Sequence, residues 1–321
     1  MILVLRALKL GDLLTSVPAL RAVARAYPSE RRVLAAPAWL TPLVDLAGCG
    51  FEVCDTAPLA PLDPLLHGAR LAVNLHGRGP ESTAILAATR PRRLLAFDLD
   101  DGPAWREDEH EVARWCRLFD AAGIPADPGD LRLTPPPGDP PAGTAGTVLH
   151  SLSGTAGTTV LHPGASTGAR RWPVGRWAAV ARSERDAGRT VTVTGSVDEV
   201  DLARSVARGA GLDDAAVLAG RTGLVELARV VAGAARVVSG DTGIAHLASA
   251  FGTPSVVLFG PVPPSAWGPP AGGPHLALWA GRLGDPHARE PDAGLLEISV
   301  TDVVEALDRL SSPAPGQPGS R

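Results

Sequence analysis

The sequence predicts an α/β protein of two halves, each a parallel sheet with helices on both faces. Short apolar runs alternate with amphipathic stretches of helical spacing, the pattern of parallel strands joined by helices. The chain has 321 residues, more than one typical domain contains. A stretch rich in Pro and Gly at about 127–146 breaks the alternation near the middle of the chain. We expect an interdomain linker there.

The first half is assigned to residues 1–146 and opens on an apolar run interrupted only by Arg6, which predicts a buried strand. A Gly-Asp turn follows, and apolar residues then recur at the spacing of a helix. Later apolar runs and amphipathic stretches continue the alternation. The predicted strands are Ile2–Leu8, Arg32–Ala36, Leu71–Leu75 and Leu94–Phe97, and the predicted helices are Leu13–Ala26, Pro42–Ala47, Ser82–Thr89 and Glu109–Ala122.

The second half is assigned to residues 147–310, where the alternation restarts with runs rich in β-branched residues. Its predicted strands are Thr158–His162, Thr190–Thr194, Val217–Ala219, Arg236–Ser239 and Ser255–Phe259. Its predicted helices are Trp172–Ala187, Asp198–Ala210, Gly223–Ala232, Gly243–Phe251 and Val300–Leu310. Residues 311–321 are rich in Pro, Ser and Gly, so we expect a disordered tail.

Composition excludes several classes of function. The net charge of −4 argues against a broad nucleic-acid surface, which needs clustered Lys and Arg. Lys9 is the only lysine among 30 basic residues, and Leu10 follows it, so no Walker A loop is present. A Schiff-base enzyme would have to use Lys9 itself. No GxGxxG motif follows a predicted strand, which argues against a dinucleotide oxidoreductase.

The cysteines and the apolar runs indicate a cellular location. Cys49, Cys54 and Cys116 form neither a CxxC pair nor an even set, so neither a disulfide framework nor a zinc site is expected. The start of the chain lacks the pattern of a signal peptide, and no apolar run approaches the roughly 18 residues of a membrane span. We therefore expect a cytoplasmic protein that could still contact the membrane surface peripherally.

The strongest candidate for a functional site is the segment 237–246, in which an apolar strand, a polar turn with two glycines and a helix follow one another. Glycine lets the backbone approach a ligand, and the free N–H groups at a helix start bind anions. Asp241, Thr242 and Gly243 therefore predict an anion site, with His246 one turn into the helix. The alternative is a structural βα turn capped by Asp241.

A second segment, 162–173, also lies between a predicted strand and a predicted helix. It contains Ser166 and the pair Arg170 and Arg171. Guanidinium groups match phosphate oxygens in pairs, so the segment could clamp a diphosphate. A solvated loop with surface arginines is the alternative.

Two segments of the first half follow predicted strands. In 6–14, Asp12 could be a general base, and Arg6 and Lys9 would keep it ionised or meet an anionic ligand. Asp12 could instead only cap the helix. In 74–82, His76 and Arg78 lie between the end of a strand and the start of a helix and could contact a ligand. Lys9, the one lysine of the sequence, lies three residues before Asp12. Either it has a function there, or a GC-rich codon bias has replaced lysine by arginine elsewhere and left this one by chance.

The chain resembles glycosyltransferase family 9, the ADP-heptose:lipopolysaccharide heptosyltransferase-like proteins. Three pieces carry the resemblance in family order, from residue 3 to about residue 261: Leu-Arg-x-x-x-x-Gly-Asp-Leu-Leu-x-x-x-Pro, His-Pro-Gly-Ala-Ser…Arg-Arg-Trp-Pro, and Ser-Gly-Asp-Thr-Gly-Ile-Ala-His…Leu-Phe-Gly-Pro. The resemblance implies a GT-B fold, in which two Rossmann-like domains face each other across a cleft. It also implies metal-independent, inverting transfer of a sugar.

The resemblance further implies a division of labour. The C-terminal half would bind the nucleoside-diphosphate sugar, with ADP-heptose as one candidate. The N-terminal half would bind the acceptor, through Arg6, Lys9, His76 and Arg78. Asp12 would be the general base that deprotonates the acceptor hydroxyl. Arg170 or Arg171 would hold the donor diphosphate, and Asp241, Thr242 and Gly243 would form the donor-binding turn. Glu199 would contact the ribose hydroxyls, and Thr222 would lie beside the base of the nucleotide.

No cofactor or metal is implied beyond this co-substrate. The acceptor would be a glycan, glycolipid or small molecule. The rival interpretations are a GT-B-like sugar-nucleotide epimerase or hydrolase, and a nucleotide-sugar-binding protein without turnover.

Overall fold

The computed structural model describes residues 1–99, 101–138 and 157–311, with only the backbone of Ser311. The chain divides into two compact units, Met1–Pro136 and Pro137–Arg321, which we describe one at a time. Among the described residues, no helix is both long enough and apolar enough to cross a membrane. The expected cytoplasmic location stays a prediction.

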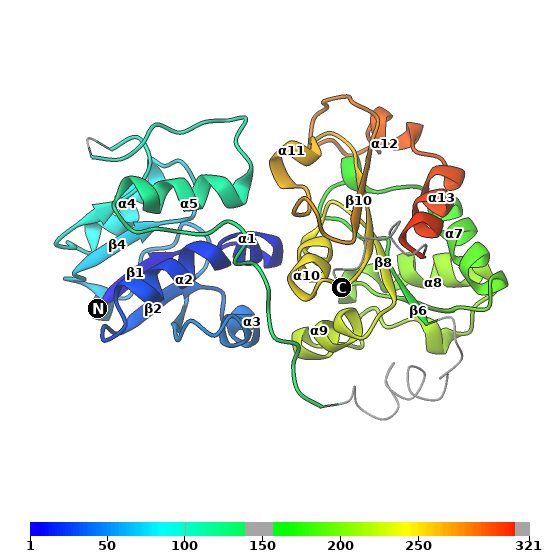
Figure 1. The fold of residues 1–321 in the computed structure, drawn as a ribbon, viewed down its shortest axis with the longest axis horizontal. Helices are drawn as coiled ribbons and strands as arrows, with labels where there is room; N and C mark the ends of the chain where they lie inside the picture. Colours follow the sequence, from blue (N-terminus) through cyan, green and yellow to red (C-terminus); the bar gives the residue numbers. More distant parts are fainter. Residues whose placement is uncertain (100, 139–156, 312–321) are drawn as a thin grey trace, which may run out of the picture. The chain divides into compact units, whose positions relative to one another are not determined.

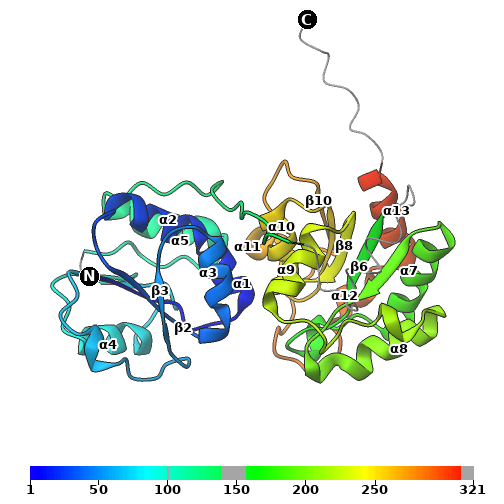
Figure 2. The ribbon, with the colours of Figure 1, turned by 90° about the horizontal axis from the view of Figure 1, so that it is seen from below.

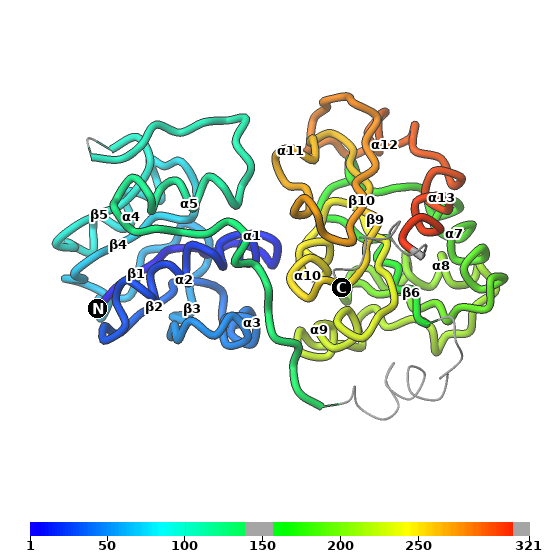
Figure 3. Tube along the Cα trace, in the orientation of Figure 1, coloured from blue at the N-terminus to red at the C-terminus, as the bar shows by residue number. Residues whose placement is uncertain are grey.

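The first unit is a five-stranded parallel sheet in the order β3-β2-β1-β4-β5 (Figures 1 and 3). Its strands are β1 (Ile2–Leu5), β2 (Arg32–Ala36), β3 (Glu52–Asp55), β4 (Leu71–Asn74) and β5 (Leu94–Leu95). Its α-helices are α1 (Leu10–Thr15), α2 (Val17–Ala26), α3 (Thr41–Leu46), α4 (Glu81–Ala88) and α5 (Glu111–Ala121), with short 3-10 turns at Ala38–Leu40 and Pro64–Leu66.

The central strand β1 is buried along its whole length, because helices cover both faces of this sheet. In register, Leu3 pairs with Val33 of β2 and with Ala72 of β4. Helices α2 and α5 pack on each other on one face of the sheet, and α4 lies on the other (Figure 2). The predicted parallel sheet with helices on both faces is therefore confirmed.

The second unit repeats this architecture with the parallel order β10-β9-β8-β6-β7. Its strands are β6 (Thr158–His162), β7 (Thr190–Val193), β8 (Arg236–Gly240), β9 (Ser255–Phe259) and β10 (His275–Trp279). Its α-helices are α7 (Val174–Asp186), α8 (Val200–Ala210), α9 (Leu224–Ala232), α10 (Gly243–Phe251), α11 (Pro264–Trp267), α12 (Ala293–Glu297) and α13 (Val300–Ser311). Three 3-10 turns join them, at Gly168–Arg170, Val197–Glu199 and Asp214–Ala216.

Helices α9 and α10 cover one face of the second sheet, and α7, α8 and α13 cover the other (Figure 1). Trp172 and Trp177 lie in this core, 2% and 1% exposed, with ring centroids 5.3 Å apart. As the helical pattern predicts, both tryptophans pack against neighbours. The hydrophobic clusters of the described residues each belong to one unit, so each unit has a core of its own.

Several predicted elements differ from the observed ones. The predicted helix Leu13–Ala26 is two helices, because the Ser16 hydroxyl donates to the Leu13 carbonyl at 2.7 Å and interrupts the regular bonding. Strands β3 and β10 were not predicted. Both lie at an edge of their sheet, where a strand pairs with only one neighbour (Figure 3). In β3, exposed Glu52 and Asp55 at the two ends also weaken the apolar signal.

The predicted strand Val217–Ala219 is reduced to one parallel bridge, between Val217 and Val193. This bridge adds Val217 beyond β7, at the edge of the second sheet. With Val217 counted, the order of the sheet becomes that of a Rossmann fold.

The Pro-rich segment is not wholly a free link, because its first residues pack on the first unit. Arg21 donates to the carboxylate of Asp130 at 2.6 Å and to the Arg132 carbonyl at 2.8 Å. Leu133 is buried. Residues 139–146 of the predicted linker and 312–321 of the predicted tail lie outside the described residues.

In each sheet, the early strands are added on one side of the first strand and the later strands on its other side. The switch point, where the side of addition changes, lies between β1 and β4 in the first sheet and between β6 and β8 in the second. Ligands of open α/β sheets bind beyond the carboxyl ends of the strands at such points. The residues that follow these four strands are therefore the candidates for binding.

Candidate functional site

In the second unit, the turn after β8 carries the strongest predicted signal. The Gly240 backbone lies close to the loop that follows β6: a Cβ on Gly240 would be 3.3 Å from the carbonyl oxygen of Arg170. Thr242 is the extended N-cap of α10, and Gly243 is the first residue of that helix. Because the first N–H groups of a helix lack intrahelical acceptors, this turn offers donors to an anion.

Asp241 and Arg170 form an ion pair at this turn. The carboxylate oxygen Oδ2 lies 3.1 Å from Nη1 of Arg170, and the Asp241 residue is 6% exposed. Burial raises the pKa of Asp241 to about 6, and the positive charge of Arg170 only partly opposes this. The buried Ser239 hydroxyl has no hydrogen-bond partner among the described residues. Polar groups without partners at a strand end suit a bound ligand.

The two arginines of the second segment have different surroundings. Arg170 reaches Asp241, whereas the exposed Arg171 donates through Nε to the Ala165 carbonyl at 3.1 Å. The structure thus separates two residues that the sequence left equivalent, and it brings only Arg170 to the β8 turn. Ser166 lies exposed on the same loop.

The loop before Arg170 is fixed to a segment about 120 residues later. Thr167 donates to the Pro286 carbonyl at 2.8 Å, and the Ala169 N–H donates to the Ala288 carbonyl at 2.9 Å. A Cβ at Gly168 would overlap the backbone of Arg289. Glycine is therefore required where these two segments meet, and the contact holds Arg170 in place.

Glu199 lies against the carboxyl ends of β6 and β7. A Cβ at Gly164 would overlap its carboxylate, and one at Gly195 would be 3.1 Å from its Cβ. Oε2 accepts the Ser196 N–H at 2.8 Å. Burial lowers the pKa of His162 nearby, and the negative charge of Glu199 opposes that shift. The weak sequence candidate Glu199 thus lies beside the loop that carries Arg170.

Two further candidates belong to the same unit. The His246 ring lies 6.0 Å from that of Trp267 of α11 in an edge contact, a neighbour that the sequence reasoning missed. Thr222 is partly exposed before α9.

In the first unit, Asp12 lies in the first turn of α1, just after β1. Its Oδ2 accepts the backbone N–H of Lys9 at 3.1 Å, and its side chain is 25% exposed. The capping role and the functional role of Asp12 are therefore compatible, because Oδ1 is not used by the cap. The Lys9 side chain is exposed.

Arg6 is 1% exposed, and it is bound on all sides. Nε donates to the Asp12 carbonyl at 2.9 Å, and Nη1 donates to the Leu75 carbonyl at the end of β4. Nη2 donates to Thr15 at 3.2 Å and lies 3.6 Å from Oδ1 of Asp12. Arg6 therefore ties together the ends of the two strands at the switch point.

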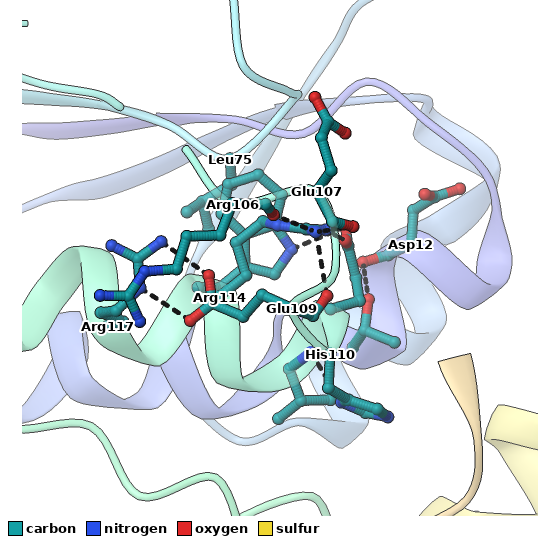
Figure 4. A network of polar contacts seen from close by, with 12 residues as sticks. Asp12, Leu75, Arg106, Glu107, Glu109, His110, Arg114 and Arg117 are labelled. Carbon is teal, nitrogen blue, oxygen red and sulfur yellow. Dashed lines mark hydrogen bonds and ion pairs between the residues drawn. The ribbon is translucent and has the colours of Figure 1, made fainter. Parts of the chain in front are cut away.

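A buried ionic network connects Arg6 to helix α5 and to the loop before that helix. Figure 4 shows this region, with Arg106, Glu109 and Arg114 labelled. Glu111 of α5 accepts Nη2 of Arg6 at 3.0 Å and Nε1 of Trp115 at 2.9 Å through Oε1. Its Oε2 accepts Nη1 of Arg114, whose Nη2 donates to the Arg106 carbonyl at 2.9 Å. Sequence reasoning assigned only a helix start here. The available signal was the helical spacing of Glu111, Arg114 and Trp115 next to a polar loop.

The other two acceptor candidates follow β4. Nδ1 of His76 is buried and has no hydrogen-bond partner among the described residues. Burial and Arg6 lower the pKa of His76, and Asp12 opposes this, so these three groups interact. Arg78 is 59% exposed and pairs with Asp98 at 2.7 Å. Thus His76 joins Asp12 and Arg6, whereas Arg78 points toward Asp98 and Glu107.

The described residues contain no cluster of three or more His, Cys, Asp or Glu side chains placed to hold a metal ion.

Two parallel five-stranded units, each with its polar candidates at its switch point, define a GT-B glycosyltransferase fold. The structure of E. coli ADP-heptose lps heptosyltransferase II matches with a TM-score of 0.73 and 20% identity, over 96% of this chain and 98% of that one. E. coli heptosyltransferase WaaC with ADP matches with a TM-score of 0.67 and 19% identity, over 96% and 99% of the two chains.

The sequence comparisons give the family. The model of glycosyltransferase family 9 (heptosyltransferase) matches residues 89–283, more than half of the chain, so the chain belongs to this family and is a glycosyltransferase. Lipopolysaccharide heptosyltransferase 2 of Escherichia coli K12 is 26% identical over 96% of this chain and 98% of its own length. Lipopolysaccharide heptosyltransferase 1 of Pseudomonas aeruginosa is 40% identical over 100 residues, 31% of this chain and 27% of that protein.

Proposed function

We propose that this chain transfers a sugar from a nucleoside-diphosphate donor to an acceptor hydroxyl, with inversion, without a metal ion, and with Asp12 as the general base. The observation that carries the proposal is the junction of the Arg170 loop with the start of α10. There a cation and free helix N–H donors meet at a switch point. The second unit would bind the donor and the first unit the acceptor.

The donor diphosphate is assigned to the β8 turn. The N–H groups of Thr242 and Gly243 and the guanidinium of Arg170 would stabilise the negative charge that builds on the leaving diphosphate, the role a metal ion fills elsewhere. Asp241 holds Arg170 in the free protein. Arg171 and Ser166 would contact the diphosphate from the same exposed loop. His246 lies one turn further along α10 and would contact the sugar or the diphosphate.

The nucleoside is assigned to the neighbouring strand ends. Glu199, beside β6 and β7, would accept hydrogen bonds from the ribose hydroxyls, and Thr222 would lie beside the base of the nucleotide. A related structure was solved with ADP, and another with ADP-2-deoxy-2-fluoro heptose. These support ADP as the nucleotide and ADP-heptose as the donor to test first.

The acceptor hydroxyl is assigned to Asp12. Oδ1 is left available by the cap, and the carboxylate is partly exposed after β1. The base removes the proton of the acceptor hydroxyl, the acceptor oxygen forms a bond to the anomeric carbon, and the bond from that carbon to the diphosphate breaks. Attack on the face opposite the leaving group inverts the carbon, by analogy with inverting glycosidases.

The other acceptor candidates take different parts. His76, with its free Nδ1, would accept a hydrogen bond from the acceptor, and Lys9 would meet an anionic group of it. Arg78 is proposed for the outer part of the acceptor, since it is exposed. Arg6 is revised from an acceptor contact to a residue that positions Asp12, because its nitrogens are already occupied.

The experiment compares Asp12→Asn with the native chain and with Asp45→Asn, which neutralises an exposed carboxylate in the same unit. ADP-heptose is the donor, and lipopolysaccharide from a heptose-deficient strain is the acceptor, since the relatives are named lipopolysaccharide heptosyltransferases. We expect Asp12→Asn to lower kcat on the order of 100- to 10,000-fold while ADP still binds. An Asp12→Asn chain with the native transfer rate would refute the base assignment. ADP release without acceptor would support a hydrolase instead.

A further inference from the structure

We propose that Glu111 is a positioning residue for the transfer reaction: acting through Arg6, its carboxylate fixes the direction of the Asp12 carboxylate and preserves its strength as a base. The inference rests on the proposed role of Asp12. It concerns a residue of α5 that lies 99 positions away in the sequence and does not itself touch the acceptor site.

The geometry forms a relay. Oε1 of Glu111 lies 3.0 Å from Nη2 of Arg6, and the same nitrogen lies 3.6 Å from Oδ1 of Asp12. Nε of Arg6 donates to the main-chain carbonyl of Asp12 at 2.9 Å. Arg6 thus holds both the backbone and the side chain of Asp12. Glu111 is the buried carboxylate among the groups that fix the plane of its guanidinium.

Glu111 is itself held rigidly. Its residue is 4% exposed, and both of its oxygens accept hydrogen bonds, from Arg6 and Trp115 on one side and from Arg114 on the other. The Trp115 ring also stacks on Arg6, with Cζ 4.7 Å from the ring centroid. Capping α5 does not require this carboxylate, because His110 accepts the Val112 N–H.

The charges explain the effect on base strength. Two arginines, Arg6 and Arg114, share one glutamate, so this buried trio has one net positive charge. Without Glu111, the positive charge of Arg6 beside Asp12 would lose its other carboxylate partner, and the Asp12 carboxylate would hold a proton less well. Half-buried His76 is a further titratable group that interacts with Asp12, and the exposed Lys9 precedes Asp12 by three residues.

Loss of Glu111 should therefore act in two ways. A more weakly basic Asp12 accepts the acceptor proton less readily, which lowers kcat rather than donor affinity. A guanidinium released from Glu111 can turn toward Asp12 and redirect it, and a misplacement of about 1 Å can slow a reaction on the order of 100-fold.

The test compares Glu111→Gln with Glu109→Gln. Glu109 pairs with Arg117 in the same region (Figure 4), and its side chain is 13% exposed. Among the described residues, no hydrogen bond or ion pair joins it to Arg6. The first readout needs no substrate. Carboxyl carbon NMR follows the titration of Asp12, assigned through its absence from Asp12→Asn. We expect the titration of Asp12 to move to lower pH in Glu111→Gln and to stay in place in Glu109→Gln.

The second readout is transfer from ADP-heptose to heptose-deficient lipopolysaccharide. We expect kcat to fall on the order of 10- to 100-fold in Glu111→Gln, with ADP affinity within about twofold and the acid limb of the rate profile moved to lower pH. Glu111→Asp serves where Glu111→Gln folds poorly. It keeps the charge, so it should keep the acid limb while lowering kcat.

The two hypotheses fail differently. A native midpoint and a native rate in Glu111→Gln would overturn the relay even if Asp12→Asn is inactive. A native rate in Asp12→Asn would overturn the proposed base. A shifted midpoint in Glu111→Gln would still support the electrostatic link between Glu111 and Asp12.

Discussion

Asp241 is a carboxylic acid held out of water beside Arg170, and its protonation should affect stability. Its pKa is raised from 3.8 to about 6, so between these values the native state holds a proton that the unfolded state has lost. The free energy of unfolding therefore falls as pH rises from about 4 to 6, by roughly 2 to 3 kcal/mol from this group. Below pH 4 this contribution is fully present.

Denaturant titrations of the native chain and of Asp241→Asn at intervals from pH 4 to 7 measure this effect. The amide cannot ionise, so the variant should lack this fall and gain stability relative to the native chain as pH rises. Parallel stability curves for the two proteins would show that Asp241 titrates normally.

Arg170 and Arg171 are neighbours in the sequence, but we expect Arg170 to contribute more to ADP binding. Arg170→Ala should weaken ADP binding by about 10- to 100-fold, the range of a charge-assisted hydrogen bond, because its guanidinium lies at the β8 turn. Calorimetry with ADP gives the affinity. Arg208→Ala, which removes an exposed arginine near the far end of α8, is the control and should bind as the native chain does. Unchanged affinity in both Arg170→Ala and Asp241→Ala would contradict the donor site.

At the scale of elements, the Arg170 loop depends on its contact with the segment 286–292. Two backbone hydrogen bonds and the Thr167 side chain join them, and Gly168 is packed against the backbone of Arg289. This contact spans elements that are far apart in sequence. The loop that carries Arg170 is therefore placed by the segment 286–292 as well as by β6.

Gly168→Ala should lower the free energy of unfolding by about 1 to 3 kcal/mol, because backbone atoms cannot yield to the new methyl group. Gly175→Ala is the matched control. Its Cβ would enter open space within α7, so it should raise stability by up to about 1 kcal/mol. Both values come from urea unfolding. Two substitutions with equal effects would refute the packing argument.

At the scale of the whole molecule, each unit has its own sheet and core, so a ligand of one unit should stabilise that unit first. ADP at 100 times its Kd adds about 2.7 kcal/mol to the stability of the unit that binds it. Hydrogen exchange should then show slower exchange in β8, at Val237 and Val238, and no change in β1, at Leu3 and Val4. Equal protection of both strands would contradict this assignment of the donor.

Much of the fold was predictable from local pattern. The bounds of β2, β6 and β9 match the prediction, because their apolar or β-branched runs are bounded by turn residues. The exposed edge strands β3 and β10 were missed. Their positions depend on pairing with a neighbour, which a local pattern does not encode. The break at Ser16 was also missed, since it depends on one side-chain hydrogen bond.

For the candidate site, local motifs identified the turn at Asp241 and the carboxylate of Asp12, because a strand, a glycine turn and a helix start follow one another in the chain. They could not identify Glu111 as the partner of Arg6 or separate Arg170 from Arg171. Those assignments need the positions of residues that lie far apart in the sequence.

By itself, the sequence determined the alternation of strands and helices, the family and the short turns that face each switch point, since all of these are encoded in neighbouring residues. Only the tertiary structure decided which side chains act together. Arg6 meets Leu75 and Glu111 across 69 and 105 positions, and Arg170 meets Asp241 across 71. The reason is that a parallel sheet orders its strands in space differently from the chain, and buried charges are stable only beside the partners that this order provides.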